Sequence, residues 1–181
     1  DKLWRTDQRV SESAFGAFRP TVNTYRETSF IAHTEKTTGN DSTIRLSSYN
    51  AVTDTWVSSY NSDSDIQVTD GMTHRPDYAD ILTTVDGQLF VTWHDNQSST
   101  TDKNEVYVRT FATDLAALTG VTQITSTIND SVYPRLTEQA TTSDIYLVWE
   151  DHREIGAIID PYADPYFASH GPHIFVAYYS K

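Results

Sequence analysis

Short stretches of apolar and β-branched residues alternate with polar positions along most of the chain. In the segment EVYVRTF, 105–111, alternate positions form two sets, Val106 with Val108 and Thr110, and Tyr107 with Arg109 and Phe111. A period of two residues with this composition predicts β-strands that have two different faces. Turn signals such as Asp86-Gly87, Gly39-Asn40 and Asp70-Gly71 separate the predicted strands. Helical periodicity is confined to about one turn in 113–120, so the pattern predicts an all-β protein.

One strand pattern recurs along the chain. IYLVWEDHR at 145–153 matches LFVTWHDNQ at 89–97, and weaker copies are SFIAHTEK at 29–36 and IFVAYYSK at 174–181. Superposition of the copies gives a ring column of His33, Trp93, Trp149 and Tyr178, and an acid column of Glu35, Asp95, Asp151 and Ser180. A sequence that repeats at this spacing predicts repeated structural units.

Each copy follows a proline, and these prolines are Pro20, Pro76, Pro134 and Pro165. Short β-like pieces lie before the first three, at 8–12, 66–70 and 122–126, and further strands follow the ring column at 42–50 and 104–114. Each repeat therefore predicts four short antiparallel strands, which is the blade of a β-propeller. The expected blades span about 19–69, 75–125, 133–160 and 164–181, within a single propeller domain or a fragment of one.

The third and fourth repeats are shorter than the first two. Only eleven residues separate Arg153 from Pro165, too few for two outer strands, and the chain ends at Lys181 within the fourth repeat. We therefore expect either segments missing from a longer parent chain, or self-association in which another chain completes the ring. A closed propeller has about 4 to 8 complete blades.

The segment Trp149-Glu150-Asp151-His152-Arg153 comes after Tyr133-Pro134-Arg135 and an apolar strand. This combination resembles blades of the broad group of secreted, sialidase-like β-propellers. The Asp-box of true sialidases, S-x-D-x-G-x-T-W, is not met, and 50–56 (NAVTDTW) shares only its end. The resemblance therefore implies an architecture and does not imply sialidase chemistry.

Composition narrows the classes of partner. The net charge of −12 repels nucleic acid and anionic membranes, and no apolar run approaches the roughly 20 residues of a membrane span. The chain has no Cys, which excludes disulfides and thiolate metal sites, and it has 11 Tyr and 4 Trp. An acidic composition rich in Thr, Ser, Asp and Tyr favours a secreted or extracellular location.

Alternate loops of an antiparallel meander lie on the same side of a sheet, so the entry loops and the loops after the ring column share one face. We expect the ligand contacts on that face, at Arg75, His94, Tyr133, Arg135, His152 and Arg153. Aromatic rings can stack on sugars, while arginine can pair with a substrate carboxylate. If the protein is an enzyme, the candidates for proton transfer or charge stabilisation are His94, His152, Tyr133, Arg135 and Arg153.

Three functions fit this face. The first is recognition of a glycan or an extracellular protein. The second is a carbohydrate-active enzyme, either a lyase acting on uronate-containing polysaccharide or a hydrolase using Asp95 and Asp151. The third is a structural subunit of an extracellular assembly, and the sequence leaves the choice open.

The run 150–154 (EDHRE) invites a catalytic interpretation. The repeat accounts for Asp151, which matches Asp95 and Glu35, but it does not account for His152 or Arg153. We therefore expect Asp151 to hold a turn, and His152 and Arg153 to lie beside Tyr133 and Arg135 as ligand contacts.

The loop 94–105 contains five oxygen-bearing side chains, Asp95, Asn96, Asp102, Asn104 and Glu105. Hard oxygen ligands in this number can hold Ca²⁺, although the spacing is not that of an EF-hand. Calcium is the one cofactor that the sequence suggests, and a solvated loop without metal is the competing interpretation.

Overall fold

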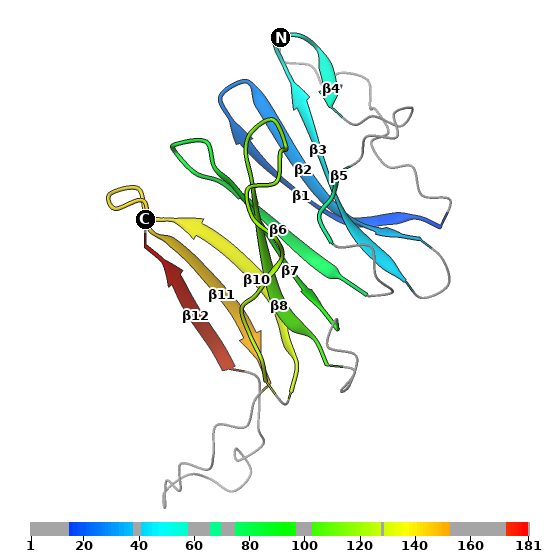
Figure 1. Cartoon of the computed structure of the whole chain (residues 1–181), viewed down its shortest axis with the longest axis vertical. Helices are drawn as coiled ribbons and strands as arrows, with labels where there is room; N and C mark the ends of the chain where they lie inside the picture. The colour runs from blue at the N-terminus through cyan, green and yellow to red at the C-terminus, as the bar shows by residue number, and fades with distance from the viewer. Residues whose placement is uncertain are drawn as a thin grey trace, which may run out of the picture.

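The computed structural model describes residues 15–37, 41–57, 66–69, 75–96, 103–127, 129–152 and 173–180. The regular secondary structure of these residues consists of β-strands alone, which form three antiparallel sheets that lie side by side (Figure 1). The all-β, propeller-like class predicted from the alternation is confirmed. No helix that could cross a membrane occurs in these residues.

The first two sheets correspond to the first two predicted blades. Sheet 1 contains β1 (Ala17–Tyr25), β2 (Thr28–Lys36), β3 (Ser42–Asn50) and β4 (Thr55–Val57), and β5 (Ile66–Gln67) also pairs with β3. Sheet 2 contains β6 (Asp77–Thr83), β7 (Leu89–Asp95), β8 (Glu105–Phe111) and β9 (Thr122–Gln123). Of the short pieces predicted before the prolines, two are β5 and β9, and the piece at 8–12 lies outside the described residues.

The third sheet corrects the prediction of a fourth blade at 164–181. It contains β10 (Ser131–Glu138), β11 (Ile145–Asp151) and β12 (His173–Tyr179), and β12 pairs with β11 along its whole length. Tyr178 lies opposite Tyr146 and is 72% exposed, so it is not a member of the ring column. An apolar alternating strand fits the second or the third place in a blade equally well, and only the pairing decides between them.

Residues 113–120 are not helical. This segment turns back on β8 through an isolated bridge between Phe111 and Ala117, and Leu115 adopts a positive φ of 69°. The Leu115 side chain is buried in the core between sheets 1 and 2. Of the apolar residues that suggested a helical turn, Leu115 therefore belongs to the core, whereas Ala116, Ala117 and Leu118 are exposed.

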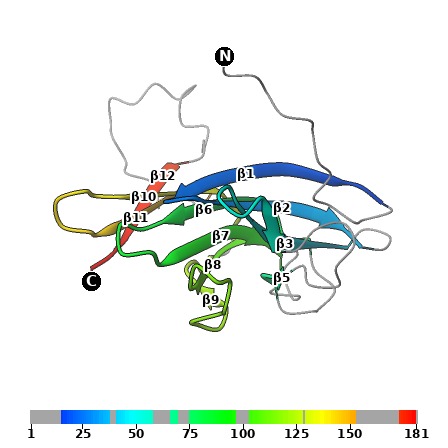
Figure 2. The same cartoon turned by 90° about the horizontal axis from the view of Figure 1, so that it is seen from above.

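The first strands of the three sheets lie together on one side of the molecule, and β8 and β9 lie on the opposite side (Figure 2). Asp80 of β6 connects all three first strands, because its carboxylate accepts hydrogen bonds from the Thr21 hydroxyl at 3.3 Å and the Leu136 N–H at 2.8 Å. This side corresponds to the central axis of a propeller.

The alternation in each strand assigns its two faces to two different neighbours. In sheet 2, Trp93 and Tyr107 pack in the core shared with sheet 1, while Val106 packs with Leu147 and Trp149 of sheet 3. The two faces predicted for 105–111 are confirmed. The buried members of the ring column are His33, Trp93 and Trp149. Trp93 and Trp149 pack between sheets as predicted, whereas His33 lies on the face of β2 opposite to Phe30 and Ala32, away from sheet 2.

Candidate functional site

The first strand of every sheet contains a β-bulge opposite the ring column. Two residues of the first strand lie opposite one residue of the second, at Arg19-Pro20, Tyr78-Ala79 and Tyr133-Pro134. The first residue of each bulge has a positive φ, 54° at Arg19, 51° at Tyr78 and 55° at Tyr133. A left-handed residue in a bulge redirects the strand and its side chain, and such bulges are common next to functional sites.

The alignment of the prolines needs one correction. Pro20 and Pro134 occupy the second bulge position, where no ladder N–H is needed, but Pro76 precedes β6 and Ala79 fills the bulge position. The spacing to the ring column shows the difference. Pro20 lies 13 residues before His33, Ala79 lies 14 before Trp93 and Pro134 lies 15 before Trp149, whereas Pro76 lies 17 before Trp93. The wrong alignment hid the equivalence of Tyr78 with Arg19 and Tyr133.

The three bulges bring together the axial cluster, which we define as Arg19, Asp77, Tyr78, His94 and Tyr133. The rings of Tyr78 and Tyr133 meet edge to face at 4.5 Å between centroids, and the His94 ring lies 5.3 Å from Tyr78 and 5.7 Å from Tyr133. The Arg19 guanidinium lies 3.9 Å from the centroid of the Tyr78 ring, a cation–π contact, and also pairs with Asp77. The Asp77 carboxylate accepts a further hydrogen bond from the Thr34 hydroxyl at 3.1 Å.

His94 is the most deeply buried ring of this cluster and contacts the backbone of Tyr133. It is 6% exposed, and its Nδ1 accepts a hydrogen bond from the Tyr133 backbone N–H at 3.2 Å. Burial and the positive charge of Arg19 lower the pKa of His94 from 6.5 to about 4, so the imidazole is neutral at physiological pH. The structure therefore places His94 in contact with the predicted ligand-binding residue Tyr133, with its Nδ1 already occupied.

Tyr133 is the most accessible ring of the cluster, with 43% of its surface exposed. The pKa of its phenol is raised, first by the neighbouring Tyr78 hydroxyl, then by desolvation and by the negative charge of Glu150. A phenol with a raised pKa keeps its proton at neutral pH. Tyr133 is thus suited to donate a hydrogen bond and poorly suited to abstract a proton.

Two open hollows flank Arg19. One, of about 410 Å³, is lined by the side chains of Arg19, Tyr78, Asp80 and Arg135 and by the smaller residues Pro20, Thr21 and Ala79. The other, of about 430 Å³, is lined by Phe18, Arg19, Lys36, Ser42, Arg75 and Asp77. The predicted residues Arg135 and Arg75 therefore lie on the same face as Tyr133 but in two separate hollows.

Glu35, Asp95 and Asp151 of the acid column are buried, whereas Ser180, which follows β12, is exposed and does not belong to the column. Asp95 and Asp151 are both fully buried, and each lies beside the ring-column residue of its own sheet. Asp95 accepts a hydrogen bond from the Arg75 N–H at 3.2 Å, and Asp151 accepts hydrogen bonds from Ser131 and the Trp149 indole, both at 3.1 Å. A carboxylate without exposed surface cannot touch a glycan, so the sequence-based hydrolase with Asp95 and Asp151 is wrong. Their hydrogen bonds agree with a structural role.

His152 is linked to the axial cluster by Glu150, which pairs with His152 and lies near Tyr133. The His152 Nε2 and the Glu150 Oε1 are 2.9 Å apart, and Glu150 is close enough to Tyr133 to raise the pKa of its phenol. The His152 backbone N–H donates to the Asp130 carbonyl at 2.8 Å. Arg153 lies outside the described residues, so its role as a ligand contact stays a prediction.

The proposed calcium ligands have other partners. Asn104 donates its N–H and its side-chain amide to Asp130, at 2.8 and 3.1 Å, and Glu105 accepts hydrogen bonds from Thr125 and the Thr127 N–H. Asn96 accepts a hydrogen bond from the Arg75 N–H at 3.3 Å, and Asp102 lies outside the described residues. Within the described part of the chain, no group of three or more metal-binding side chains is close enough to hold an ion. Calcium binding in this loop stays a prediction.

Comparison with known proteins supports the fold and no closer relationship. No protein-family model matches the chain, and no curated protein matches it in sequence. Among solved structures it is similar to an alpha-L-arabinofuranosidase from Lactobacillus brevis, with 15% identity, a TM-score of 0.53, and coverage of 91% of this chain and 53% of that one.

Two further solved structures agree. They are an endo-arabinase from Bacteroides thetaiotaomicron VPI-5482 and the GH93 alpha-L-arabinofuranosidase of Fusarium graminearum in complex with arabinobiose, both at 12% identity and a TM-score of 0.52. The alignments cover 89% and 83% of this chain, and 55% and 40% of those chains. The chain thus spans about half the length of the structures it matches, and at these identities the similarity shows the β-propeller-like fold alone.

Proposed function

We propose that this protein recognises carbohydrate through the axial cluster and the hollow lined by Arg19, Tyr78, Asp80 and Arg135. The observation that carries the proposal is the convergence of three equivalent bulge residues, Arg19, Tyr78 and Tyr133. Arg19 and Tyr78 line the open hollow, and Tyr133 packs against Tyr78. Aromatic rings beside a few fixed polar groups in a concave site suit a sugar, which presents apolar ring faces and hydroxyl groups.

The solved structures of similar fold support a carbohydrate ligand. They are two alpha-L-arabinofuranosidases and an endo-arabinase, and one of them is in complex with arabinobiose. Transfer of a carbohydrate ligand to this chain rests on analogy of fold. The choice of arabinobiose as the first ligand to test follows from it.

A glycan-cleaving enzyme is the second candidate. A glycosidase needs two carboxyl groups about 5 to 9.5 Å apart on either side of the scissile bond. On the axial face Asp77 is paired with Arg19, and Asp80 is bound to Thr21 and Leu136, so both carboxylates are already engaged in holding the strands. A polysaccharide lyase is disfavoured by the raised pKa of Tyr133 and the buried, neutral His94.

The proposal is tested by titration calorimetry with arabinobiose and longer arabino-oligosaccharides, with polygalacturonate as a uronate-containing comparison. Tyr133→Ala should weaken binding by roughly 10-fold or more, because a central aromatic contact commonly contributes over 1 kcal/mol. The matched control is Tyr146→Ala, a tyrosine of the same sheet whose hydroxyl contacts Gln139 instead. Equal affinity in both variants would contradict the axial site.

Product assays separate the candidates. A glycosidase would release reducing ends, a lyase would form an unsaturated product that absorbs in the ultraviolet, and a recognition protein would bind without product. Binding to none of a panel of plant and microbial polysaccharides, together with self-assembly, would favour the structural subunit. The extracellular location expected from composition belongs to the same proposal.

The roles assigned to Asp151 and His152 are also tested here. His152→Ala should reduce binding and leave the melting temperature unchanged, because the pair that its side chain forms with Glu150 lies at the surface. Asp151→Ala should lower the melting temperature, because Ser131 and the Trp149 indole lose their buried acceptor. The reverse pattern would show that the two roles were exchanged.

A further inference from the structure

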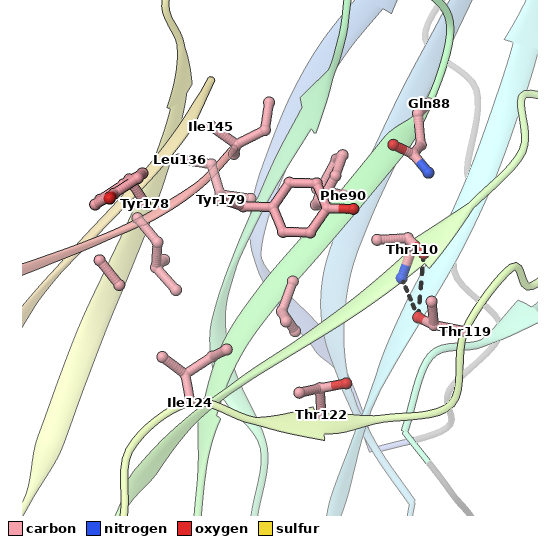
Figure 3. A pocket seen from close by; sticks show the side chains of 13 residues that line it. Gln88, Phe90, Thr110, Thr119, Thr122, Ile124, Leu136, Ile145, Tyr178 and Tyr179 are labelled. Carbon is pink, nitrogen blue, oxygen red and sulfur yellow. Dashed lines mark hydrogen bonds between the residues drawn. The ribbon is translucent and has the colours of Figure 1, made fainter. Parts of the chain in front are cut away.

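A cavity of about 300 Å³ lies between sheets 2 and 3, away from the axial cluster. Figure 3 shows the side chains around it, with Phe90, Ile124, Leu136 and Tyr179 among them. Phe90 lies at one end of β7 and His94 near the other, so the cavity and the axial cluster occupy opposite ends of the same strand. The cavity is therefore a separate feature from the proposed carbohydrate site.

A difference between equivalent residues creates this cavity. Strand pairing places Arg109 opposite Val91 in sheet 2, and Ala177 opposite Leu147 in sheet 3, so Arg109 and Ala177 hold the same position in the blade. At the interface of sheets 1 and 2, the Arg109 side chain crosses to sheet 1, where its Nη1 donates to the Val68 carbonyl at 2.8 Å. Its guanidinium also lies 5.4 Å from the centroid of the Phe111 ring. Ala177 leaves the corresponding space between sheets 2 and 3 open.

The opposite wall is also built from smaller side chains. Leu46 of β3 pairs with Ala32, and Val108 of β8 pairs with Thr92, which makes Leu46 and Val108 equivalent. Leu46 is fully buried in the core between sheets 1 and 2, whereas Val108 lines the cavity between sheets 2 and 3. The same backbone arrangement thus gives a filled core at one interface and a pocket at the other.

The lining restricts what can bind. None of the lining side chains carries a charge, and the apolar wall includes Phe90, Leu136, Leu147 and Tyr179. A charged ligand would lose its hydration without gaining a partner, so the site excludes it. The polar groups are Gln88, three threonines and the hydroxyls of Tyr178 and Tyr179. Among the threonines, Thr119 binds the Thr110 N–H and hydroxyl through its Oγ1 at 3.1 Å (Figure 3).

We propose that this cavity is a binding site for an uncharged, mostly apolar ring compound that carries one hydroxyl or carbonyl group. The rings of Phe90 and Tyr179 already contact each other, with 6.0 Å between their centroids, so the ligand ring would pack against this pair while its polar group reaches the threonines. A volume of about 300 Å³ is at the lower end of small-molecule sites, and apolar cavities smaller than this bind benzene. The partly exposed Ile124 and Tyr179 mark where a ligand can enter.

The test uses the uncharged fluorescent probe N-phenyl-1-naphthylamine with the full chain. We expect saturable binding to the wild-type protein, displaced by benzyl alcohol and at least 10-fold less effectively by benzoate, which has a similar shape but carries a charge. Absence of saturable probe binding, or equal displacement by both compounds, would overturn the proposal. This comparison needs no variant and does not involve the axial site.

Two variants of neighbouring residues locate the probe. Ala177→Phe fills the cavity and should weaken probe binding at least 10-fold, and Ala177→Leu should weaken it by a smaller factor. Val176→Phe is the matched control, because Val176 belongs to the same strand but is exposed on the other face of sheet 3. Equal affinity in Ala177→Phe and Val176→Phe would place the probe elsewhere. Failure of the axial variant Tyr133→Ala to affect sugar binding would leave this result unchanged.

Discussion

The two interfaces between neighbouring sheets use the same backbone arrangement and differ in how they are filled. Between sheets 1 and 2, Phe30, Leu46, Val91 and Trp93 belong to one continuous buried core. Between sheets 2 and 3, the buried core contains Val106, Leu147 and Trp149, with a cavity beside it. Strand register and the ring column recur at both interfaces, so the repeat determines the frame, while individual side-chain volumes decide whether the space is core or pocket.

The burial of equivalent strands shows the same difference. Every residue of β7 in the middle sheet is buried, whereas alternate residues of β11 are partly exposed and most of β12 is exposed. A central blade is covered on both faces by its neighbours, and a terminal blade is covered on one. The stability of each blade therefore depends on its neighbours as much as on its own sequence.

The largest expected loss of stability comes from replacing the tryptophans of the ring column, and it should differ between the two interfaces. Trp93 is 1% exposed in the filled interface, and Trp149 is 7% exposed in the interface that contains the cavity. Removal of a buried large side chain costs roughly 3–5 kcal/mol. We expect Trp93→Ala near the upper end of that range and Trp149→Ala near the lower end, measured by urea unfolding. A loss below about 1 kcal/mol for Trp149→Ala would show that its ring is not part of a core.

Arg109→Ala should open a cavity between sheets 1 and 2 that resembles the cavity between sheets 2 and 3. The variant loses the hydrogen bonds to the Val68 and Thr119 carbonyls and the packing of the arginine stem, at a cost of about 2–3 kcal/mol. It should also create a second binding site for N-phenyl-1-naphthylamine, detected as an increased number of bound probes per chain. Unchanged stoichiometry would show that the surrounding side chains collapse into the space.

The equivalent acids Asp95 and Asp151 allow a test by pH. Burial raises the pKa of Asp95 to about 7, and its Oδ2 has no hydrogen-bond partner within the described residues. A carboxyl with a raised pKa in the folded state keeps its proton there after the unfolded chain has lost it, so its contribution to stability falls as pH rises from about 4 to 7.

Asp95→Asn should remove this fall, which makes the variant more stable relative to wild type at pH 7 than at pH 4 by about 1–3 kcal/mol. Chemical unfolding across this range measures the difference. His94 contributes in the opposite direction, because its pKa near 4 makes stability rise between about 4 and 6.5. The contribution of Asp95 is therefore measured as the difference between the variant and wild type. A parallel shift of Asp95→Asn at all pH values would contradict the raised pKa.

The smallest effect is expected from partial filling of the second interface. Val108→Leu restores the residue found at the equivalent position 46 and adds one buried methylene, which should stabilise the protein by about 0.5–1 kcal/mol. Thermal unfolding measures the gain. A loss of stability would show that the cavity wall near Val108 is already tightly packed.

The candidate site was predictable in part. Tyr133, Arg135, Arg75 and His94 were expected on one face from their loop positions, and they do lie there around Arg19. Tyr78, Asp77 and Asp80 were missed, because the proline alignment was three residues out of register in the second repeat. The left-handed bulge that unites Arg19, Tyr78 and Tyr133 has no fixed residue type, so it is visible only in the backbone.

The sequence by itself determined the strands, their two faces and the burial of Trp93 and Trp149, because alternation and turn residues act over short distances. Only the tertiary structure decided that β12 completes sheet 3, since an apolar strand has the same local pattern whichever partner it pairs with. The cavity likewise depends on Ala177 and Val108 meeting across two sheets, a relation between residues far apart in the chain. Long-range packing, and not local preference, therefore decided which interface between sheets is filled and which contains a cavity.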